Sequence, residues 1–329
     1  MAYHVPILVD ETIDKLDIKK DGIYIDCTLG FGGHSEHIAK RLSNKGRIIG
    51  MDLDPYALKT AKEKLKEKCN ITFYNNSYKD FPKILEENNI KEVDGFLFDL
   101  GISSYQVDSE HRGFSYRFNS PLCMKFNPND NDYTARELVN YASEKELSEI
   151  IKKYGEERYH KRIAKKIVGT RKKNKIETTF DLKDIIFSAV PYKSSKILSR
   201  VFQSFRIAVN DEINTFTNSL TESIKFLKIG GKIAVISFHS IEDRIVKHFF
   251  KNNTNTDRKM SLRILTKKPI VAKYDEVKIN RRSKSAKLRE LQKDYHEKTK
   301  KHKFHKLHFI FFIHNELYCI SNHLPNFKK

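Results

Sequence analysis

A glycine-rich turn, followed about 20 residues later by a carboxylate, is the first feature of this chain whose residue types and spacing indicate chemistry. The apolar run 23–28 breaks into the turn 30–33 (Gly-Phe-Gly-Gly), and a second apolar run, 47–51, ends in Asp52. Glycine permits positive φ and lets the backbone approach a ligand closely. A carboxylate at this distance can accept hydrogen bonds from both hydroxyls of a ribose. The pattern therefore predicts a strand, a tight turn, a helix and a strand that together bind a nucleoside.

The turn differs from the motif that binds dinucleotides. Gly30 and Gly32 are followed by Gly33, His34 and Ser35, with no third glycine at the required offset. A pyrophosphate would also use the free N-terminus of the helix. S-adenosylmethionine carries no phosphate and binds the same frame, so we expect it as the cofactor. Any βαβ unit can have glycines at its turn and an aspartate after a strand, so this motif needs support from the rest of the chain.

Two other predicted strands end in polar residues. The apolar run 93–99 ends in Asp99 and is followed closely by Ser103, while the run 232–238 is followed by His239. In a doubly wound sheet, ligands bind beyond the carboxyl ends of the strands. We therefore expect Asp99 and Ser103 to face the same cleft as Asp52. His239 is a candidate base or base-stacking group, although a histidine in such a position is often structural.

The elements that must position these residues follow an α/β pattern. Strand-like runs and helical stretches alternate through the first hundred residues, which predicts a parallel sheet. Helical periodicity then covers 134–154, 157–168 and 181–189. An apolar stripe over 200–227 predicts one long amphipathic helix that stops at Gly230-Gly231.

Strands are expected again at 232–238, and further strands at 261–266 and 286–291. The simplest arrangement is one α/β domain with a helical domain inserted after its fourth strand. The expected bounds are 1–104 for the first part of the α/β domain, 105–199 for the insertion, 200–292 for the second part and 293–329 for a basic, solvated and frayed tail.

Composition restricts the partners of the chain. The formal net charge is +20 over 329 residues, with a pI near 9.5, which suits a polyanion such as nucleic acid. A lysine-rich proteome would also raise the charge. Four well-separated cysteines without a CxxC motif indicate a reducing cytoplasm and no metal site. The absence of a signal peptide or a long apolar run predicts that the protein does not associate with a membrane.

A series of motifs, in order from His4 to about Arg289, resembles the 16S ribosomal RNA (cytosine-N4)-methyltransferase family, also called RsmH or MraW. The joint occurrence of these motifs is highly specific. They are HVPILVDE, YIDCTLGFGGHSE, MDLDP, DGFLFDLGISSYQVD, RGFSY, YGEERY-x-KRIAKKIV, RVFQSFRIAVNDE, GGKIAVISFHSIEDRIVK, LTKKPI and RSKSAKLR.

The resemblance implies a class I (Rossmann-like) S-adenosylmethionine-dependent methyltransferase with an inserted helical domain. It implies that the enzyme methylates N4 of a cytidine in the decoding region of 16S ribosomal RNA within the small ribosomal subunit. The oligomeric state stays open, with a homodimer as one arrangement. The catalytic candidates are Asp99, Ser103 and His239. The residues assigned to the cofactor are Gly32, Gly33, His34, Asp52, Tyr78, Asp99 and Gln106, with Asp26 added on position alone.

Substrate contacts are expected from aromatic and basic residues. The side chains that could stack on the target base are Tyr105, Phe114 and Tyr116. Phosphate contacts are expected from the range 281–287 and from basic residues of the insertion, namely Arg158, Lys161, Arg162, Lys165 and Lys166.

The chain departs from the family pattern in two places. The family usually shows GPLDMRMD where residues 120–127 read SPLCMKFN, so Cys123 and Asn127 replace carboxylates and Lys125 replaces an arginine. Tyr105 replaces the usual proline. Two alternatives therefore stay open: a non-catalytic, cofactor-binding RNA-interaction protein, and a methyltransferase that acts on a small molecule or a protein.

Overall fold

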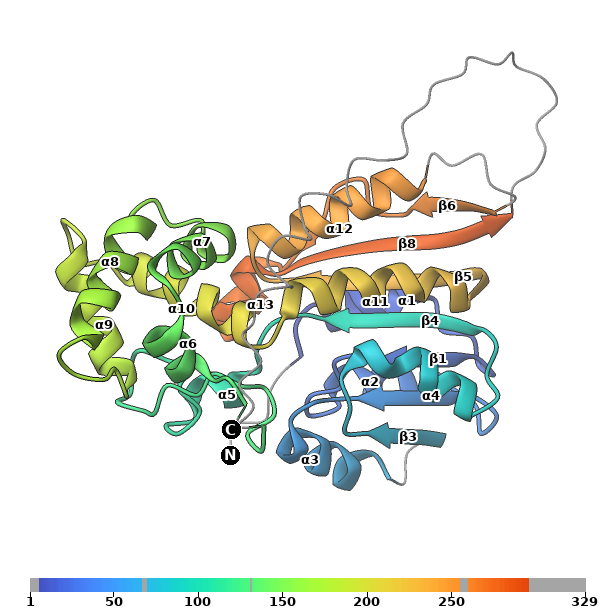
Figure 1. Ribbon diagram of the computed structural model, residues 1–329. Coiled ribbons are helices and arrows are strands. Elements are labelled where there is room, and N and C mark those ends of the chain that lie inside the picture. The colour runs from blue at the N-terminus through green and yellow to red at the C-terminus, as the bar shows by residue number, and fades with distance from the viewer. Residues whose placement is uncertain (1–5, 67–69, 131, 255–259, 296–329) are drawn as a thin grey trace, which may run out of the picture. The chain divides into compact units, whose positions relative to one another are not determined.

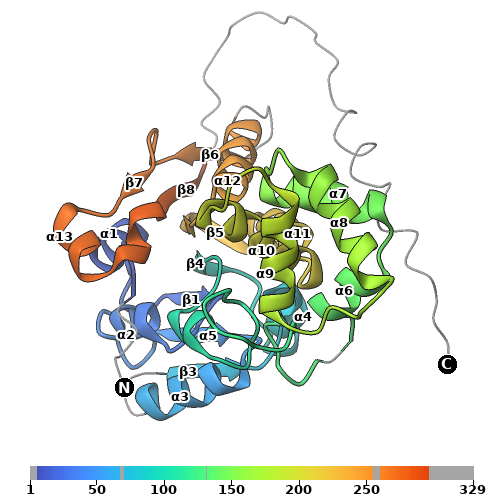
Figure 2. The same cartoon turned by 90° about the vertical axis from the view of Figure 1, so that its left-hand side faces the viewer.

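A mostly parallel sheet carries the candidate site, and the computed structural model describes residues 6–66, 70–130, 132–254 and 260–295. In this part of the chain the sheet has eight strands. They are β1 (Ile23–Asp26), β2 (Arg47–Met51), β3 (Asn70–Tyr74), β4 (Val93–Asp99), β5 (Leu227–Ser237), β6 (Met260–Ile264), β7 (Ile270–Val271) and β8 (Lys287–Tyr295). Their order is β3-β2-β1-β4-β5-β8-β6 (Figure 1). Strand β7 pairs with β8 (Figure 2).

The strand order creates a switch point between β1 and β4. Strands β3, β2, β1, β4 and β5 are parallel, while β8 runs antiparallel to both β5 and β6. The chain builds outwards from β1 to β3 and then continues on the other side of β1 with β4. Crevices at such reversals hold ligands in doubly wound sheets. The predicted α/β fold is confirmed, including the two later strands.

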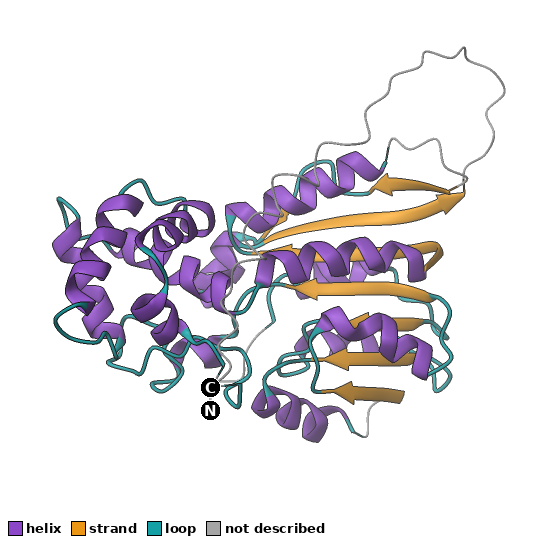
Figure 3. Ribbon diagram, in the orientation of Figure 1, coloured by secondary structure: helices purple, strands orange, loops and turns teal. Residues whose placement is uncertain are grey.

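Helices cover both faces of the sheet (Figure 3). The helical elements of the α/β domain are α1 (Val9–Leu16), α2 (Gly33–Ala39), α3 (Pro55–Leu65), η1 (Tyr78–Asp80), α4 (Phe81–Glu87), α11 (Glu212–Phe226), α12 (Ser240–Asn253), α13 (Tyr274–Ile279) and η2 (Arg281–Ser285). Phe81, Phe216 and Phe250 anchor α4, α11 and α12 in the core on one face. Ile13 and Ile38 anchor α1 and α2 on the other. Burial of each such side chain contributes roughly 1.5–3 kcal/mol.

Helices occupy the chain after β4, where the strand pattern is interrupted. They are α5 (Ser104–Asp108), α6 (Ala135–Tyr141), α7 (Glu144–Gly155), α8 (His160–Arg171), α9 (Thr179–Ala189) and α10 (Ser195–Val209). Helices α6 to α10 share a core, separate from those of the sheet, that contains Leu147, Ile163, Leu182 and Phe205. Figures 1 and 2 show these helices as a group beside the sheet. That core continues to Val209, so α10 packs with the insertion beyond the predicted boundary at residue 199.

The single helical segment expected over 134–154 is two helices. Each begins with a capping box, formed by Thr134 with Glu137 at α6 and by Ser143 with Glu146 at α7. In such a box both residues satisfy backbone N–H groups that the first turn of a helix leaves without partners. The second box starts a new helix where the apolar spacing alone suggested continuity.

The long helix predicted over 200–227 is also broken. Asp211 adopts a left-handed φ of 47° between α10 and α11. The Asn210 amide accepts a hydrogen bond from the Phe126 N–H at 2.9 Å and donates to the Met124 carbonyl at 2.7 Å. Tertiary partners therefore hold the break. The predicted stop at 230–231 is wrong as well, because α11 ends at Phe226 and both glycines lie inside β5.

The last strand extends further than its sequence pattern indicates. β8 continues to Tyr295, beyond the expected end of the α/β domain at residue 292. The remainder of the predicted basic tail lies outside the described residues. Among the helices that the structure describes, none is long and apolar enough to cross a membrane.

Glu290 is a buried carboxyl group on β8 that lacks a hydrogen-bond partner. Its side chain is fully buried, and neither Oε atom has a partner within the described structure. Burial raises the pKa of Glu290 to about 8, although the charges of Lys232 and Lys15 act in the opposite direction. The ionised form therefore destabilises the fold.

We expect Glu290→Gln to stabilise the protein in a pH-dependent way. The folded pKa exceeds the unfolded one, so the stabilising contribution of the carboxyl is present at low pH and is lost as the pH rises towards 8. Between pH 5 and pH 8, the free energy of unfolding of the variant should gain roughly 3 kcal/mol relative to the wild type. Urea unfolding at several pH values measures this. Exposed Glu87→Gln is the control, and parallel pH profiles for wild type and Glu290→Gln would contradict the expectation.

Candidate active site

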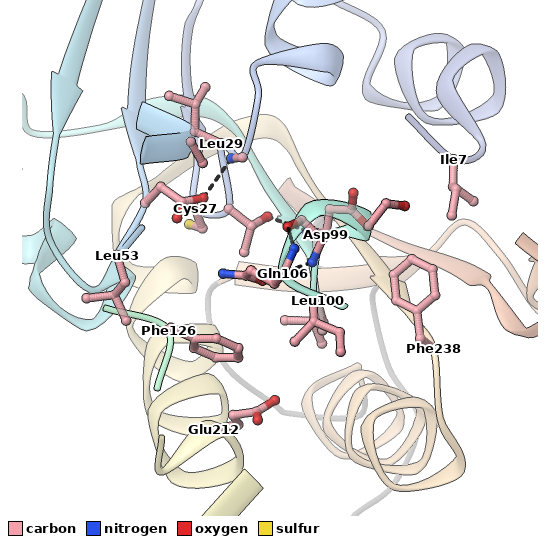
Figure 4. Close-up of a pocket in the computed structure, with 18 of the residues that line it drawn as sticks. Ile7, Cys27, Leu29, Leu53, Asp99, Leu100, Gln106, Phe126, Glu212 and Phe238 are labelled. Carbon is pink, nitrogen blue, oxygen red and sulfur yellow. Dashed lines mark hydrogen bonds between the residues drawn. The ribbon is translucent and has the colours of Figure 1, made fainter. Parts of the chain in front are cut away.

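A cavity of about 300 Å³ lies at the carboxyl ends of β1, β2 and β4 (Figure 4). Most of the residues predicted to bind cofactor or to act in catalysis line it. They are Gly33, His34, Asp52, Tyr78, Asp99, Ser103 and Gln106. Among the described residues, Gly32 and His239 are not part of its lining. Gly32 and His239 are instead the N-cap residues of α2 and α12. Asp26 does not line the cavity either, and it accepts a hydrogen bond from Ser35 Oγ at 2.7 Å.

The glycine turn needs glycine for two reasons. Gly30 and Gly32 have φ values of 52° and 73°, which residues with a Cβ rarely adopt. A Cβ on Gly32 would lie 2.7 Å from Leu65, and one on Gly33 would lie 2.9 Å from Pro6. The turn therefore packs against Leu65 of α3 and against Pro6 of the N-terminal segment. Gly33 also lines the cavity.

Asp52 holds the glycine turn in place. Its two carboxylate oxygens accept hydrogen bonds from the Gly30 N–H at 2.7 Å and from the Asp54 N–H at 2.8 Å. Burial raises the pKa of Asp52 to about 6, the two amide hydrogen bonds lower it, and the charges of Asp54 and Asp26 raise it further. The carboxylate thus lines the cavity and also fixes the loops on both sides of it.

Asp99 presents an unpartnered oxygen. Its N–H donates to Thr28 Oγ1 at 2.6 Å, and its Oδ2 lies 3.6 Å from His34 Nδ1. The buried Oδ1 has no hydrogen-bond partner in the described structure. Burial raises the pKa of Asp99 well above its usual value, and the charges of Asp26 and Glu242 add to the effect. Such an orphaned acceptor indicates a ligand that donates a hydrogen bond or carries positive charge.

Ser103 and Gln106 form a capping box at the start of α5. The Gln106 N–H donates to Ser103 Oγ at 3.2 Å, and the Ser103 N–H donates to Gln106 Oε1 at 3.0 Å. The same Gln106 amide donates to Asp54 Oδ2 at 3.2 Å. Both predicted site residues therefore shape the loop after β4, in addition to lining the cavity.

A buried ion pair lies beneath this loop. Arg112 Nη1 donates to Asp54 Oδ2 at 2.8 Å, and only 8% and 1% of the two side chains are exposed. Arg112 Nη2 donates to the carbonyls of Lys125 and Phe126 at 3.1 Å and 2.7 Å. These contacts join the N-terminus of α3 to the loop that contains the altered SPLCMKFN motif.

Another part of the cavity wall contains Tyr78 and the ion pair between Arg206 and Glu212. Burial raises the pKa of Tyr78 well above 10, with the charge of Glu212 next in effect. Arg206 and Glu212 form two hydrogen bonds, at 2.8 Å and 2.9 Å, across the break between α10 and α11. Both residues of this pair line the cavity. The wall is therefore polar but internally paired.

His239 has the contacts of a helix cap. Its Nδ1 accepts a hydrogen bond from the Glu242 N–H at 3.3 Å, and its Nε2 lies 3.1 Å from Glu242 Oε1. The carboxylate in turn accepts from the Phe238 N–H at 2.8 Å. Burial acts to raise the pKa of Glu242, but its contact with His239, the charge of Arg206 and the hydrogen bond from the Phe238 N–H lower it below its usual value. The catalytic role of His239 stays a prediction.

The sequence patterns did not assign the charged residues that complete or support these walls. Arg206, Glu212 and Glu242 line the cavity, and Asp54 and Arg112 form the ion pair beneath it. Asp54 precedes a proline at the first turn of a helix, a pattern that indicates a cap. The two arginines stand in motifs with no local signal of burial. Only their tertiary partners give them their place in the site.

The candidate stacking residues have different environments. Tyr105 stacks on Tyr56 at a centroid distance of 4.5 Å. Tyr116 is partly buried and packs against the helical core. Phe114 is 7% exposed and stacks on Phe126 inside that core, so the prediction that it meets the target base is wrong.

The predicted basic surface of the insertion is largely exposed. Lys161, Arg162 and Lys165 on α8 are exposed, as is Lys166. The guanidinium of Arg158 lies 4.6 Å from the ring centroid of Tyr159.

The second predicted basic region is partly paired. Arg281 is exposed, but Arg282 binds both oxygens of Asp108 at 3.0 Å, and Lys287 pairs with Asp243 at 3.0 Å. Phosphate contacts from Arg282 or Lys287 would compete with these ion pairs.

Comparison with known proteins places this site in a family. Two curated relatives, from Clostridium botulinum (strain Loch Maree / Type A3) and Caldicellulosiruptor saccharolyticus, are each named ribosomal RNA small subunit methyltransferase H. The first is 44% identical over 88% of this chain and 98% of its own, and the second is 45% identical over 89% of this chain and 100% of its own. Solved structures that resemble this one include an rRNA methylase from Streptococcus thermophilus, with a TM-score of 0.41 and 10% identity over 87% of this chain and 93% of that one. A family model described as the MraW methylase family matches residues 1–294, and the chain belongs to this family.

Proposed function

We propose that the protein, a methyltransferase through its membership of the MraW methylase family, methylates N4 of a cytidine in the decoding region of 16S ribosomal RNA with S-adenosylmethionine as methyl donor. The observation that carries this proposal is the cavity in which the glycine turn, Asp52 and the unpartnered oxygen of Asp99 meet. The names of the curated relatives support the substrate. We further propose that it acts in the cytoplasm on RNA within the small subunit.

The residues of the cavity fit this cofactor. The Asp52 carboxylate suits the ribose hydroxyls, and Tyr78, which also lines the cavity, suits the adenine. The unpartnered Oδ1 of Asp99 suits a cationic group. The turn before α2 would bring backbone atoms of Gly33, which lines the cavity, against the methionine part. When bound, S-adenosylmethionine supplies an electrophilic methyl group on a positively charged sulfur.

The target amine needs activation because its lone pair is delocalised into the cytosine ring. Asp99 can accept a hydrogen bond from that amine and then the proton that leaves as the N–C bond forms. The loop from Leu100 to Ser103 lies beside it and orients the amine. Positioning of this kind supplies much of the rate in group transfer. The raised pKa of Asp99 brings its proton affinity closer to neutral pH, which suits a general base.

The altered SPLCMKFN loop keeps its backbone connections. Met124 N–H donates to the Arg112 carbonyl at 3.0 Å, and the Asn210 amide binds both Met124 and Phe126. Of the described residues, neither Cys123 nor Asn127 lines the cavity. The missing carboxylates therefore affect positions outside the proposed chemistry, which favours a catalytic protein over a purely RNA-binding one.

The insertion supports an RNA substrate over a small molecule. Its α8 surface presents a row of exposed cations, and the adjoining Arg158 lies over an aromatic ring. Glu156, at the end of α7, accepts hydrogen bonds from Ser240 and Arg244 of α12 at 2.6 Å and 2.7 Å. These contacts tie the insertion to the sheet edge that bears the cavity.

We expect Asp52→Ala to weaken cofactor binding by roughly 5- to 150-fold, which corresponds to about 1–3 kcal/mol for unpaired polar groups in a buried site. The Gly30 and Asp54 amides lose their acceptor at the same time. Isothermal titration with S-adenosylmethionine measures the change. Asp14→Ala removes an exposed carboxylate and should leave the affinity unchanged. Equal affinities for the Asp52 variant and the wild type would contradict the assignment.

We expect Asp99→Asn to lower kcat/KM by a factor of about 10²–10⁴, the contribution of a positioned acid or base. In the wild type, kcat/KM should rise with pH through a pKa above the ordinary range of aspartate, because burial favours the protonated form. The variant should lack this dependence. Methyl transfer to small-subunit RNA across a pH series tests both points. Full activity of Asp99→Asn with cofactor bound would overturn the proposed base.

We expect charge reversal on α8, as Lys161→Glu, Arg162→Glu and Lys165→Glu, to weaken RNA binding while cofactor affinity stays constant. The slope of log Kd against log salt should fall by roughly 0.7 for each phosphate that the variant no longer neutralises. The matched control reverses exposed lysines of the α/β domain, namely Lys40, Lys83 and Lys225. An unchanged slope in the α8 variant would mean that this surface is only solvated.

A further inference from the structure

Three aromatic rings gather at the edge of the cavity. Tyr56 and Tyr105 stack at a centroid distance of 4.5 Å with planes 18° apart. Phe31 meets both rings edge-on, at 6.2 Å and 5.7 Å. The rings come from three separate elements: Phe31 from the glycine turn, Tyr56 from the first turn of α3 and Tyr105 from the first turn of α5. Their meeting is therefore a product of the fold.

The rings belong to the rim of the cavity and not to a hydrophobic core. Phe31 lines the cavity, as do Ala57 and Ser104, the chain neighbours of the two tyrosines. None of the three rings belongs to a hydrophobic core cluster in the described part of the chain. Tyr56 remains 41% exposed even though one face of its ring is covered by Tyr105.

Hydrogen bonds to Asp54 join the two helix starts that carry Tyr56 and Tyr105. The Gln106 amide, adjacent to Tyr105, donates to Asp54 at 3.2 Å, and Asp54 caps the helix that carries Tyr56. Arg112 binds the same carboxylate oxygen at 2.8 Å. These contacts hold the helix starts that carry the two stacked rings, which reduces the entropy that is lost when a ligand binds there.

The place of Tyr105 indicates which ligand meets the rings. It follows Ser103 by two residues, and the loop up to Ser103 is where the target amine is proposed to lie. A target base that enters the cavity must leave its stack, so the neighbouring bases lose a stacking partner. Exposed aromatic faces are the usual replacement in single-stranded RNA recognition. The net charge of +20 favours the approach of the RNA backbone.

We propose that the Tyr56–Tyr105 pair is a stacking surface for an unpaired nucleobase that flanks the target cytidine. The inference rests on the proposed function, since it extends the same site to a second nucleotide.

The test compares two double variants. Tyr56→Ala with Tyr105→Ala removes the rings, while Tyr56→Phe with Tyr105→Phe keeps them and removes only the hydroxyls. Tyr141→Ala, which removes another exposed tyrosine (67% exposed), is the surface control. The probe is a small-subunit RNA segment that carries 2-aminopurine next to the target cytidine. Circular dichroism checks that each variant is folded.

The alanine pair should bind this RNA roughly 5- to 100-fold more weakly, in line with the loss of one stacked base. It should also lose the fluorescence quenching seen with the wild type. The phenylalanine pair and Tyr141→Ala should behave as the wild type, and cofactor affinity by titration should stay within about twofold.

Two outcomes would overturn the inference. RNA affinity and quenching that match the wild type in the alanine pair would mean that the rings are merely solvated. A loss of cofactor affinity with unchanged RNA binding would assign the rings to the cofactor. Failure of the proposed function appears separately, as absence of methyl transfer to small-subunit RNA by the wild type, whereas stacking is read from the fluorescence.

Discussion

The buried ion pair between Arg112 and Asp54 is the interaction on which the site depends most. It joins the loop after β2, the capping box of α5 and the backbone of the altered loop at Lys125 and Phe126. Breaking a buried pair by removing one partner typically costs about 3–5 kcal/mol, because the other charge stays buried. Because the pair lies under the cavity and not in it, its contribution is to hold the walls at a fixed separation.

The break between α10 and α11 connects this network to the rest of the chain. Asn210 binds the backbone of Met124 and Phe126, next to the carbonyls that Arg112 holds. Just across the break, Arg206 and Glu212 close the opposite wall of the cavity. In one continuous helix, Arg206 and Glu212 would lie at different heights along the same axis and would not face each other. The insertion, the altered loop and the sheet therefore share one set of polar contacts, and movement of any of them would change the shape of the cavity.

Sequence reasoning succeeded where a local pattern determines the structure. Buried parallel strands are continuous apolar runs, and the glycine turn and Asp99 follow directly from the strands before them. It failed where distant partners decide. The left-handed residue at Asp211 depends on contacts that Asn210 makes with Met124, more than 80 residues away. The charges of Arg206 and Glu212 resemble those of an ordinary helix surface, because nothing in the local sequence indicates that a cavity lies beside them.

The distribution of charge separates the two ligands that the proposed reaction needs. The chain as a whole carries +20, and α8 adds a row of exposed cations, whereas the cavity gathers the carboxyl groups of Asp52, Asp99 and Glu242. Burial and mutual repulsion raise the pKa of Asp99, so a cationic ligand would relieve an unfavourable arrangement. A polyanion is attracted to the surface but is repelled by these carboxylates, so the part of an RNA that can enter the cavity is an uncharged base. The same electrostatic contrast therefore favours a sulfonium inside, phosphates outside and a neutral nucleobase between them.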